Sequence, residues 1–526
     1  MLSRRSLLSI AAASVAAPAI AQSTRDKTLR FVPQAGLSSL DPIWTTAAVV
    51  QNHGFYVFDT LYGLDARFNV MPQMAAGHSV SDDKLTWTVT LRDGLMFHDG
   101  VPVRAVDCIA SLKRWAARDV LGQLLAASVD EWLAKDDKTL VIRLRQPFPL
   151  MLFALAKPAT NVPFIMPERL AMTDPLKQVT EMVGSGPYRF LAQDFVSGTR
   201  AAYAKFAGYR PAPGNPERTS GGKIAHFDRI EWTAMPDSAT ALAALQTGEI
   251  DWWEQVLADT VPLLKRNRNI TLGDGDPNGY IGVVRFNSSQ APFNNVKLRE
   301  AVLRAVNQVD YLGAITNNDP SAYQTCHTTI PCGTPYTATP ANQAMSDKPN
   351  LARARDLVKA SGYNGEKIVI LNPADFPTIR PMGQITHDTL LKLGLNSELL
   401  ETDWGTVLQR RGSREPADKG GWSIFHTWFQ AVGNTLPPML SYTRGQGAAG
   451  WFGWYESKAA EALNQQWLTA ATEAERIRLA LDIQTVAAQE APVVPLGLFR
   501  IRTAYRNSIT GMVEGVSPFP WGVRRT

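Results

Sequence analysis

Hydrophobic and polar residues alternate along residues 84–97, KLTWTVTLRDGLMF, on both sides of Asp93 and Gly94. A period of two is typical of strands with one buried face, and an Asp-Gly pair between two such runs is typical of a tight hairpin turn. The stretch therefore predicts a strand, a turn and a second strand.

His98, Asp99 and Gly100 follow directly. A neighbouring His and Asp could form a catalytic pair or part of a metal site, but no nucleophile or second ligand stands nearby in the sequence. Asp99 can accept a hydrogen bond from the backbone ahead of it, and Gly100 can adopt a positive φ. We therefore interpret the pair as part of a turn, with His98 at the strand end or in solvent, before an amphipathic helix near 103–116.

Residues 227–256, FDRIEWTAMPDSATALAALQTGEIDWWEQV, have the pattern of a strand, a helix and a strand. Asp237 or Ser238 can cap the helix, and Gly248 can end it in the left-handed conformation. Two strands joined through a helix are expected to be parallel, with a right-handed crossover.

Residues 295–313 carry apolar residues at helical spacing, which predicts one amphipathic helix with a stripe that faces the core. Glu300 and Arg304 are spaced as a supporting ion pair on the other side. The stripe comprises Leu298, Val302, Ala305, Val309 and Leu312.

Helical and strand patterns then alternate towards the end of the chain. Asn350 and Gly362 are suited to begin and end one helix, and Gly394 to end another. Strands are predicted at EKIVIL, NSELLE and GWSIFHTWF, and helices near 378–393 and within DWGTVLQRRG and EAERIRLALDIQTVAAQEA. Such alternation is typical of an α/β sheet domain.

With 526 residues the chain is long enough for several cores, because single cores stop growing at roughly 250–300 residues. Hydrophobic residues make up 45% and charged residues 19%, which favours a folded globular protein over a disordered one. The net charge of +5 is spread without a long Lys/Arg run, so we expect no nucleic-acid partner.

The first residues, MLSRRSLLSIAAASVAAPAIAQ, combine Arg4 and Arg5 with a mildly apolar run and the small-residue end AIA. These features predict a cleavable export signal over residues 1–21 and a mature chain that begins at Gln22. The apolar run is shorter than the roughly 20 residues that a membrane span needs, which disfavours an anchor. SRRSLL fits a twin-arginine signal, and a chance arginine pair in a Sec signal stays open.

The chain has three cysteines, and export would place them in an oxidising compartment. Cys326 and Cys332 lie in CHTTIPCG, where Pro331 and Gly333 favour a loop that brings the two sulfurs together, so we predict a disulfide. Cys108 lies in an amphipathic helical pattern and is expected to be a buried small apolar residue.

Motifs for common enzyme chemistry do not occur in the chain, among them H-E-x-x-H, G-x-S-x-G, C-x-x-C and G-x-x-x-x-G-K-[ST]. The seven histidines are scattered, so their spacing supports no metal site. GQGAAG, residues 445–450, matches G-x-G-x-x-G but lacks the strand before it and the helix after it that a dinucleotide loop needs. We therefore predict no catalytic residue, no metal and no cofactor.

Four longer stretches are LRDGLMFHDGVPVRAVDCIASLKRW, VGSGPYRF, FDRIEWTAMPDSATALAALQTGEID and APFNNVKLREAVLRAV. Together, and in this order, they resemble the family 5 extracellular solute-binding proteins, which are the dipeptide- and oligopeptide-type receptors of ABC importers. The resemblance covers nearly the whole mature chain. It implies an α/β, periplasmic-binding-protein-like fold with two lobes, a hinge that closes them over a ligand, and an extra subdomain in the first lobe.

The resemblance also implies domain limits, which composition alone does not supply. The first lobe would combine residues 22–59, 187–279 and 495–526. The extra subdomain would span residues 60–186, and the second lobe residues 280–494. The ligand is expected in the cleft between the lobes.

Dipeptide receptors of this family hold the ligand's amino group with an Asp in a GDPDN-like loop, and its carboxylate with an Arg in an RPY-like segment. The stretch that matches the loop, FHTWFQAVGNTLPPML, has no acid between His426 and Leu440. The ungapped match to the segment, NPADFPTIRP, places Pro373 at the Arg position, and Arg380 is the candidate substitute. We therefore expect a modified peptide or another small organic molecule as ligand.

Aromatic and neutral polar residues are the other candidate ligand-binding residues, because aromatic rings supply much of the burial in ligand sites. The strand that ends near residue 430 is expected to lead into the cleft, and strand alternation puts Trp422 and Trp428 on one face, with Trp422 in the core. The candidates are Trp428, Phe429, Gln430, Asn434 and, near the start of the mature chain, Trp44.

The resemblance implies a soluble, monomeric periplasmic receptor that delivers a small solute to the permease and ATPase of an inner-membrane ABC importer. Two alternatives remain. A secreted hydrolase would turn its ligand over, and a receptor for a sensor protein would present the same closed surface as an import receptor. The sequence leaves the identity of the ligand open.

Overall fold

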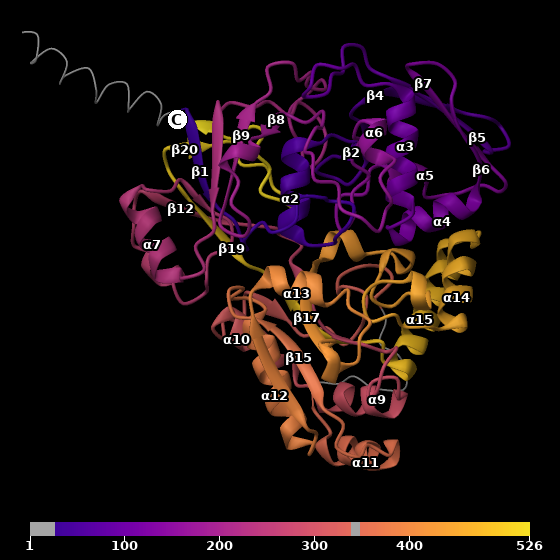
Figure 1. Cartoon of the computed structure of the whole chain (residues 1–526), viewed down its shortest axis with the longest axis vertical. Helices are drawn as coiled ribbons and strands as arrows, with labels where there is room; N and C mark the ends of the chain where they lie inside the picture. Colours follow the sequence, from indigo (N-terminus) through magenta and orange to yellow (C-terminus); the bar gives the residue numbers. More distant parts are fainter. Residues whose placement is uncertain (1–26, 338–347) are drawn as a thin grey trace, which may run out of the picture.

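Residues 27–337 and 348–526 are described by the computed structural model of the chain, and the predicted export signal lies outside them. Two lobes stand one above the other in Figure 1, each built around its own sheet. Within the described residues, no helix is long and apolar enough to cross a membrane.

A seven-stranded sheet in the order β12-β19-β11-β1-β10-β9-β8 forms the first lobe. Segments far apart in the sequence meet in it, because β1 pairs in parallel with both β10 and β11, while β19 joins β11 and β12 from near the C-terminus. The strands are β1 (Thr28–Val32), β8 (Tyr188–Phe190), β9 (Arg200–Lys205), β10 (Arg229–Thr233), β11 (Trp252–Trp253), β12 (Ile270–Asp274) and β19 (Arg502–Arg506).

The connection from β10 to β11 confirms the predicted strand, helix and strand. Asp237 accepts a hydrogen bond from the backbone N–H of Thr240 and so caps α7 (Ser238–Thr247), and Gly248 ends the helix at φ +79°. The two flanking strands are parallel, as expected, with β1 lying between them. Other elements of this lobe are α2 (Ala48–Val57), α8 (Val261–Lys265), β2 (Tyr62–Leu64), β3 (Val70–Pro72), β20 (Ile509–Thr510) and β21 (Arg524–Arg525).

A four-stranded antiparallel sheet in the order β4-β5-β7-β6 lies within the range predicted for the extra subdomain. Its strands are β4 (Ala75–Val80), β5 (Thr86–Leu91), β6 (Val129–Ala134) and β7 (Thr139–Leu144). The helices nearby are α3 (Ala105–Ala116), α4 (Val120–Ser128), α5 (Met151–Leu155) and α6 (Glu168–Ala171). Figure 1 shows this subdomain at the upper right, with α4 facing the second lobe.

The hairpin predicted around Asp93 and Gly94 is only half correct. The turn exists, with Gly94 at φ +74°, but the second strand is reduced to a single bridge from Met96 to Pro102. Because β4 and β7 already pair with the two edges of β5, the chain after the turn finds no free edge of that strand.

The His98 turn is confirmed, whereas a solvent-exposed His98 is wrong. Asp99 Oδ1 accepts a hydrogen bond of 3.2 Å from the N–H of Val101, and Gly100 has φ +85°. The Nε2 atom of His98 lies 3.0 Å from the carbonyl oxygen of Gly186, and burial lowers the pKa of the imidazole to about 4. His98 therefore attaches this turn to a neighbouring loop of the scaffold.

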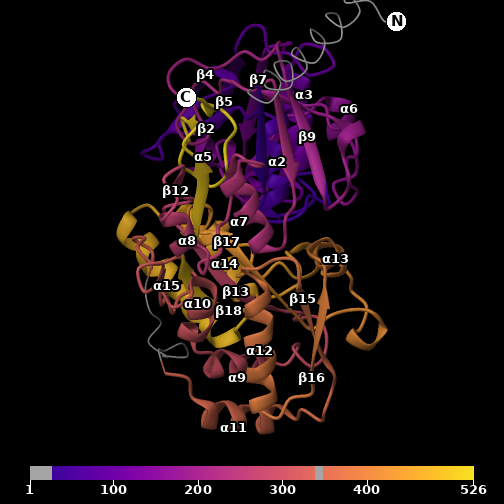
Figure 2. The same ribbon diagram turned by 90° about the vertical axis from the view of Figure 1, so that its left-hand side faces the viewer.

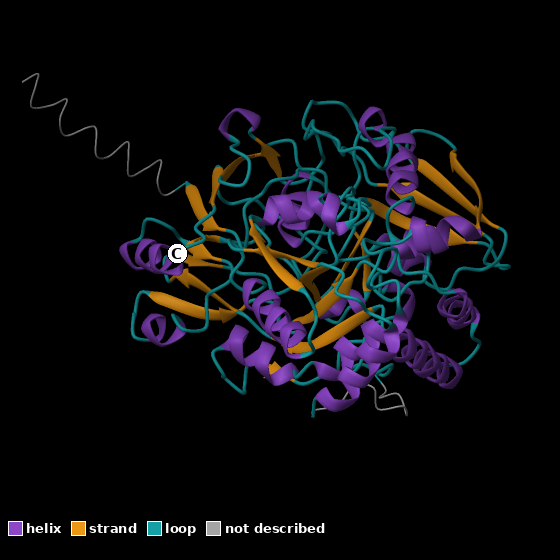
Figure 3. Ribbon diagram, turned by 60° about the horizontal axis from the view of Figure 1, so that its bottom comes forward, coloured by secondary structure: helices purple, strands orange, loops and turns teal. Residues whose placement is uncertain are grey.

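A six-stranded mixed sheet in the order β14-β18-β13-β17-β15-β16 forms the second lobe. Its strands are β13 (Tyr280–Phe286), β14 (Tyr323–Gln324), β15 (Ile368–Pro373), β16 (Ser397–Thr402), β17 (Ile424–Gln430) and β18 (Val493–Phe499). Figure 3 shows helices around the strands. In this lobe they include α11 (Leu351–Ser361), α12 (Arg380–Lys392), α13 (Trp404–Arg410), α14 (Lys458–Thr469) and α15 (Glu473–Glu490).

The single helix predicted over residues 295–313 is wrong, because two helices occupy the region: α9 (Val296–Ala305) and α10 (Gln308–Thr316). Asn307 has an extended backbone, and its side chain accepts a hydrogen bond from the N–H of Val309, which starts the second helix. The break changes the register, so Val309 is 41% exposed and does not belong to the core stripe. Glu300 and Arg304 form the predicted ion pair at 2.8 Å.

The chain crosses between the lobes twice, at residues 275–279 after β12 and at residues 500–501 after β18. The crossings lie side by side, since the N–H of Gly275 donates to the carbonyl oxygen of Ile501 at 3.3 Å. All of β18 pairs within the second-lobe sheet, which places the return crossing after Phe499 rather than at residue 494. Figure 2 shows the two lobes from the side, one above the other.

Cys326 and Cys332 form a disulfide, as predicted, with Cα atoms 5.8 Å apart. Cys108 is a free, buried cysteine on α3, which confirms its expected place in the core. Burial raises the pKa of the Cys108 thiol well above its usual range, so this side chain is not a reactive thiolate.

Candidate ligand-binding site

Hydrogen bonds join the two lobes directly. Gln446 Nε2 donates to Gln123 Oε1 at 2.5 Å, and Trp451 Nε1 donates to Thr46 Oγ1 at 3.3 Å. These bonds link the second lobe to the extra subdomain and to the start of α2. The lobes are therefore in a closed arrangement.

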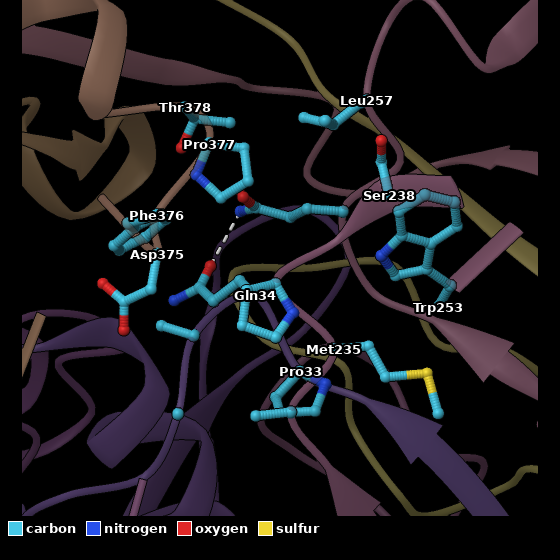
Figure 4. A pocket seen from close by; sticks show the side chains of 15 residues that line it. Pro33, Gln34, Met235, Ser238, Trp253, Leu257, Asp375, Phe376, Pro377 and Thr378 are labelled. Carbon is cyan, nitrogen blue, oxygen red and sulfur yellow. Dashed lines mark hydrogen bonds between the residues drawn. The ribbon is translucent and has the colours of Figure 1, made fainter. Parts of the chain in front are cut away.

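Three hollows lie along the boundary between the lobes. Figure 4 shows the first, where Gln34 and Trp253 of the first lobe face residues 375–378 of the second. Gln34 Oε1 accepts a hydrogen bond from Gln255 Nε2 at 2.7 Å. With a volume of about 30 Å³, this hollow is too small for more than a water molecule or two.

The largest hollow is a cavity of about 640 Å³ between the extra subdomain and the second lobe. Its size lies within the range of roughly 300–1,000 Å³ that is usual for small-molecule sites. We call it the interlobe cavity. Its first-lobe lining includes Trp44, Thr46, Arg118, Asp119, Lys157 and Asp174, and its second-lobe lining includes Arg414, Ser441, Gln446, Trp451, Phe452 and Trp454.

Basic side chains exceed acidic ones in this lining. Lys157 and Asp119 form a buried ion pair, so their charges cancel. The side chain of Arg118 donates to the carbonyl oxygen of Trp44 at 3.2 Å, and burial lowers the pKa of its guanidinium. Arg414 donates to the carbonyl oxygen of Ala448 at 2.8 Å. Within the described residues, neither Arg118 nor Arg414 has a carboxylate partner in an ion pair, so the cavity suits an anionic group.

Aromatic rings supply the apolar part of the interlobe cavity. The guanidinium of Arg414 lies 4.8 Å from the ring centre of Trp454, which orients both side chains. Trp451 packs against Phe429 at a centroid distance of 5.3 Å. Trp44, one of the residues predicted from sequence, lines the opposite wall and donates its Nε1–H to the carbonyl oxygen of Leu176 at 3.1 Å.

A third, small hollow of about 10 Å³ lies between the start of α2 and the end of β17. Three predicted residues, Trp428, Phe429 and Gln430, contribute to its lining, together with Arg411. Thr46 lines both this hollow and the interlobe cavity. We call it the inner pocket, because it lies at the end of β17.

Trp428 is 6% exposed and is held by other side chains. Its Nε1–H donates to Thr378 Oγ1 at 3.1 Å, and its ring packs edge-on against Tyr280 at 4.5 Å. Gln430 Nε2 reaches the carbonyl oxygen of Val516 at 3.5 Å, which joins it to the first lobe. Trp422, by contrast, is 1% exposed and packs on neighbouring rings of the core.

Two predicted residues lie outside all three hollows. Asn434 is fully buried and donates to the carbonyl oxygen of Gln430 at 2.9 Å, so it fixes the loop after β17. Arg380 begins α12 and forms a half-exposed ion pair with Glu401 at 3.2 Å. Glu401 lies opposite Asn372 in the β15–β16 pairing, so Arg380 is engaged in an ion pair beside the end of β15 and lines none of the three hollows.

Sequence reasoning missed Arg411, which is 1% exposed at the C-terminal end of α13. A signal for it was present, because Trp404, Val407, Leu408 and Arg411 recur at the i, i+3, i+4 and i+7 spacing of a core-facing stripe. An arginine in such a stripe must find a partner for its charge.

Metal binding finds no support in the described residues, where no group of three or more His, Cys, Asp and Glu side chains could hold a metal ion. The two most buried histidines, His53 and His426, have pKa values lowered to about 3 by burial. They are neutral core groups, bonded to Tyr203 and Thr386 respectively.

Comparison with known proteins identifies the family of this chain. Residues 69–451 match the family model described as bacterial extracellular solute-binding proteins, family 5 Middle. A probable peptide ABC transporter periplasmic-binding protein of Sinorhizobium fredii is 37% identical over 505 residues, which cover 95% of this chain and 94% of that protein. The glutathione-binding protein of Escherichia coli is 29% identical over 497 residues, which cover 91% and 90% of the two chains.

Solved structures agree in fold. The ABC transporter-associated periplasmic binding protein DppA of Helicobacter pylori, in complex with the peptide STSA, superposes with a TM-score of 0.78 at 22% identity. The match covers 95% of this chain and 98% of that one. The two-lobed, periplasmic-binding-protein-like architecture expected from the sequence is thereby confirmed.

Proposed function

The chain belongs to the family 5 bacterial extracellular solute-binding proteins and is a receptor that delivers a solute to an ABC importer; on this premise we propose that it captures its ligand in the interlobe cavity. The observation that carries the proposal is a cavity of about 640 Å³ whose walls come from both lobes. A ligand that contacts both walls stabilises the closed arrangement, which is the form that a transporter would recognise.

The ligand that we propose is a small peptide-like molecule, or another small organic molecule, without a free amino group to bury. Relatives are named for peptides and for glutathione. In this chain no acid stands between His426 and Leu440, where dipeptide receptors carry the Asp for the amino group. A charged ammonium enclosed without a partner costs several kcal/mol, which would remove most of the roughly −8 kcal/mol of a micromolar ligand.

Calorimetric titration of the mature protein tests this ligand class. Unmodified dipeptides are expected to bind weakly, whereas N-acetylated peptides of the same sequence and glutathione derivatives with a blocked amine are expected to bind better. Low-micromolar binding of a simple unmodified dipeptide would contradict the proposal.

Three tryptophan variants test the location. Trp44→Ala and Trp428→Ala should each weaken a ligand found in the titration by at least about 1 kcal/mol, the scale of one lost aromatic contact. Trp132→Ala is the control, since Trp132 lies on β6 and lines none of the three hollows. If the wild type, the Trp44 variant and the control bind the ligand with equal affinity, the ligand does not bind in the interlobe cavity.

We also propose that the receptor is a monomer that binds without chemical turnover and that it reaches the periplasm through a cleaved signal. A bound compound should be recovered unchanged by mass spectrometry, and turnover would favour the hydrolase. The exported protein should begin at Gln22, and normal export of a variant with Arg4→Lys and Arg5→Lys would assign the signal to the Sec class.

A further inference from the structure

We propose that the ligand carries a carboxylate and that Arg411 is the residue that binds it, in the inner pocket beside the interlobe cavity. The proposal rests on the proposed function and names the ligand chemistry of that site. Arg411 provides a buried guanidinium, a hydrogen bond across the lobe boundary and a place in the lining of the inner pocket.

The other buried arginines of the described residues all have compensated guanidinium groups. Arg114 pairs with Asp41 at 2.7 Å and Arg444 with Glu461 at 2.5 Å. Arg285 and Arg299 each donate to three backbone carbonyl oxygens. Compensation of this kind is the rule for buried charges.

Arg411 departs from this rule. Its one side-chain hydrogen bond runs from Nη2 to Thr45 Oγ1 at 3.2 Å, and its Nε–H has no partner in the described residues. No described carboxylate forms an ion pair with it. The remaining neighbours of the guanidinium are rings, with the centroids of Phe452 at 4.6 Å, Phe425 at 5.6 Å and Trp404 at 5.9 Å.

Arg411 keeps its charge at neutral pH. Burial lowers the pKa of its guanidinium to about 9, which is still above the pH of the periplasm near neutrality. Rings offset part of the lost hydration of a cation, but they cannot accept its in-plane N–H groups. A ligand carboxylate supplies what is missing, because its two oxygens match the planar fork of donors.

The position of Arg411 links this charge to closure. Arg411 belongs to the second lobe and Thr45 to the first, so their hydrogen bond exists only when the lobes meet. Thr46, the next residue, lines both the inner pocket and the interlobe cavity. A ligand in the cavity can therefore extend one group past Thr46 towards Arg411. Because the inner pocket of about 10 Å³ has room for no more than one water molecule, its side chains must move apart to admit a planar carboxylate, and further apart to admit a bulkier phosphate.

The first test needs no ligand. Arg411→Met removes the charge while it keeps an unbranched apolar side chain, so the ligand-free variant should melt at a higher temperature than the wild type. Arg285→Met is the matched control, because it removes an arginine of the same lobe that donates to three backbone carbonyl oxygens, and this variant should melt at a lower temperature. A lower melting temperature for Arg411→Met would overturn the proposal, since Arg411 would then be a structural residue.

The second test uses N-acetyl-alanyl-alanine and its C-terminal amide as a matched pair of probes. The wild type should bind the acid at least about 30-fold more tightly than the amide. Arg411→Met should abolish this preference, and Arg411→Lys should restore part of it. An acid that binds the wild type no better than its amide, or that binds Arg411→Met with unchanged affinity, would overturn the proposal.

The two levels of proposal remain distinguishable. If Trp44→Ala weakens binding of the acid and Arg411→Met does not, the interlobe cavity is the site and Arg411 is not its anion-binding residue. If neither variant changes the affinity, both the location and the role of Arg411 are wrong.

Discussion

Arg285 and Arg411 lie in the same lobe, are both 1% exposed and both have a pKa lowered to about 9 by burial, yet their surroundings differ. Arg285 lies on β13 and donates to the carbonyl oxygens of Phe452, Tyr442 and Pro492. Arg411 donates to a single hydroxyl, that of Thr45 across the lobe boundary. The first arginine holds three chain segments together, whereas the second keeps donors free at the edge of a cavity.

This difference separates structural from functional burial of charge. A charge enclosed for stability is surrounded by acceptors from its own lobe. A charged group buried to bind a ligand keeps N–H donors that no protein group accepts from, and these free donors determine which chemical group the ligand must supply.

Arg285→Met should lower the free energy of unfolding by about 4 kcal/mol, because it leaves three buried carbonyl groups without their donor. Chemical denaturation of the purified mature protein measures the change. Arg285→Lys should lose less, since an ammonium can still reach some of these oxygens. If Arg285→Met lowers the free energy of unfolding by less than 1 kcal/mol, Arg285 is not a stabilising residue and does not differ from Arg411 in this respect.

Histidine shows a third way to tolerate a buried base, which is to lose its proton. The folded pKa of His426, about 3, lies below the unfolded value of 6.5, so its contribution to stability is complete above pH 6.5 and is lost as the pH falls towards 3. At pH 5 the loss should be about 2 kcal/mol.

Unfolding curves between pH 5 and pH 8 measure this slope. His426→Gln should make the unfolding free energy depend less steeply on pH, because one proton fewer is taken up on unfolding. His53→Gln should do the same in the first lobe, where burial also lowers the histidine pKa to about 3. An unchanged slope in both variants would show that these histidines do not control the acid sensitivity.

Reduction of the Cys326–Cys332 disulfide should cost about 2 kcal/mol, as expected for so small a loop. The loop supports the Arg285 region, because Thr329 accepts a hydrogen bond from the hydroxyl of Tyr442, whose own carbonyl oxygen accepts from Arg285. Thiol counting on the denatured, non-reduced protein should find one free thiol, Cys108. Three free thiols in protein from the periplasm would refute the bridge.

Thr45→Val should have the smallest effect, a loss of about 1 kcal/mol in the free energy of unfolding, because it removes the one hydrogen bond of the Arg411 side chain. The same change in an Arg411→Met background should cost less, because only the 3.3 Å hydrogen bond from the N–H of Ala47 to Thr45 Oγ1 is then lost. The difference between the two costs is the coupling energy of the pair. Equal costs in both backgrounds would mean that Thr45 acts through other neighbours.

Local chemistry in the sequence predicted much of the scaffold. Asp237 and Gly248 delimit α7, and Asn350 and Gly362 delimit α11, because caps and left-handed residues act over three or four positions. The turn at Asp99 and Gly100 follows from the same short-range bonding. The family resemblance then supplied the two-lobed architecture.

Partners from distant parts of the chain decided the rest. The strand expected after Gly94 did not form because β4 and β7 already occupy both edges of β5. Helical periodicity continued through Asn307, and the break there, which exposes Val309, combines the local cap of the Asn307 side chain with the packing of α10 against β18.

The site depends on the tertiary structure most of all. Trp44 and Trp451 are more than 400 positions apart in the sequence and line one cavity, because lobe closure brings them together. The sequence alone showed Arg411 as one member of a helix, and only the folded chain reveals that its charge lacks a counter-ion at the lobe boundary. Periodicity predicts which face of a helix or strand is buried. A binding site depends on which distant residues contact that face, and only the tertiary structure shows this.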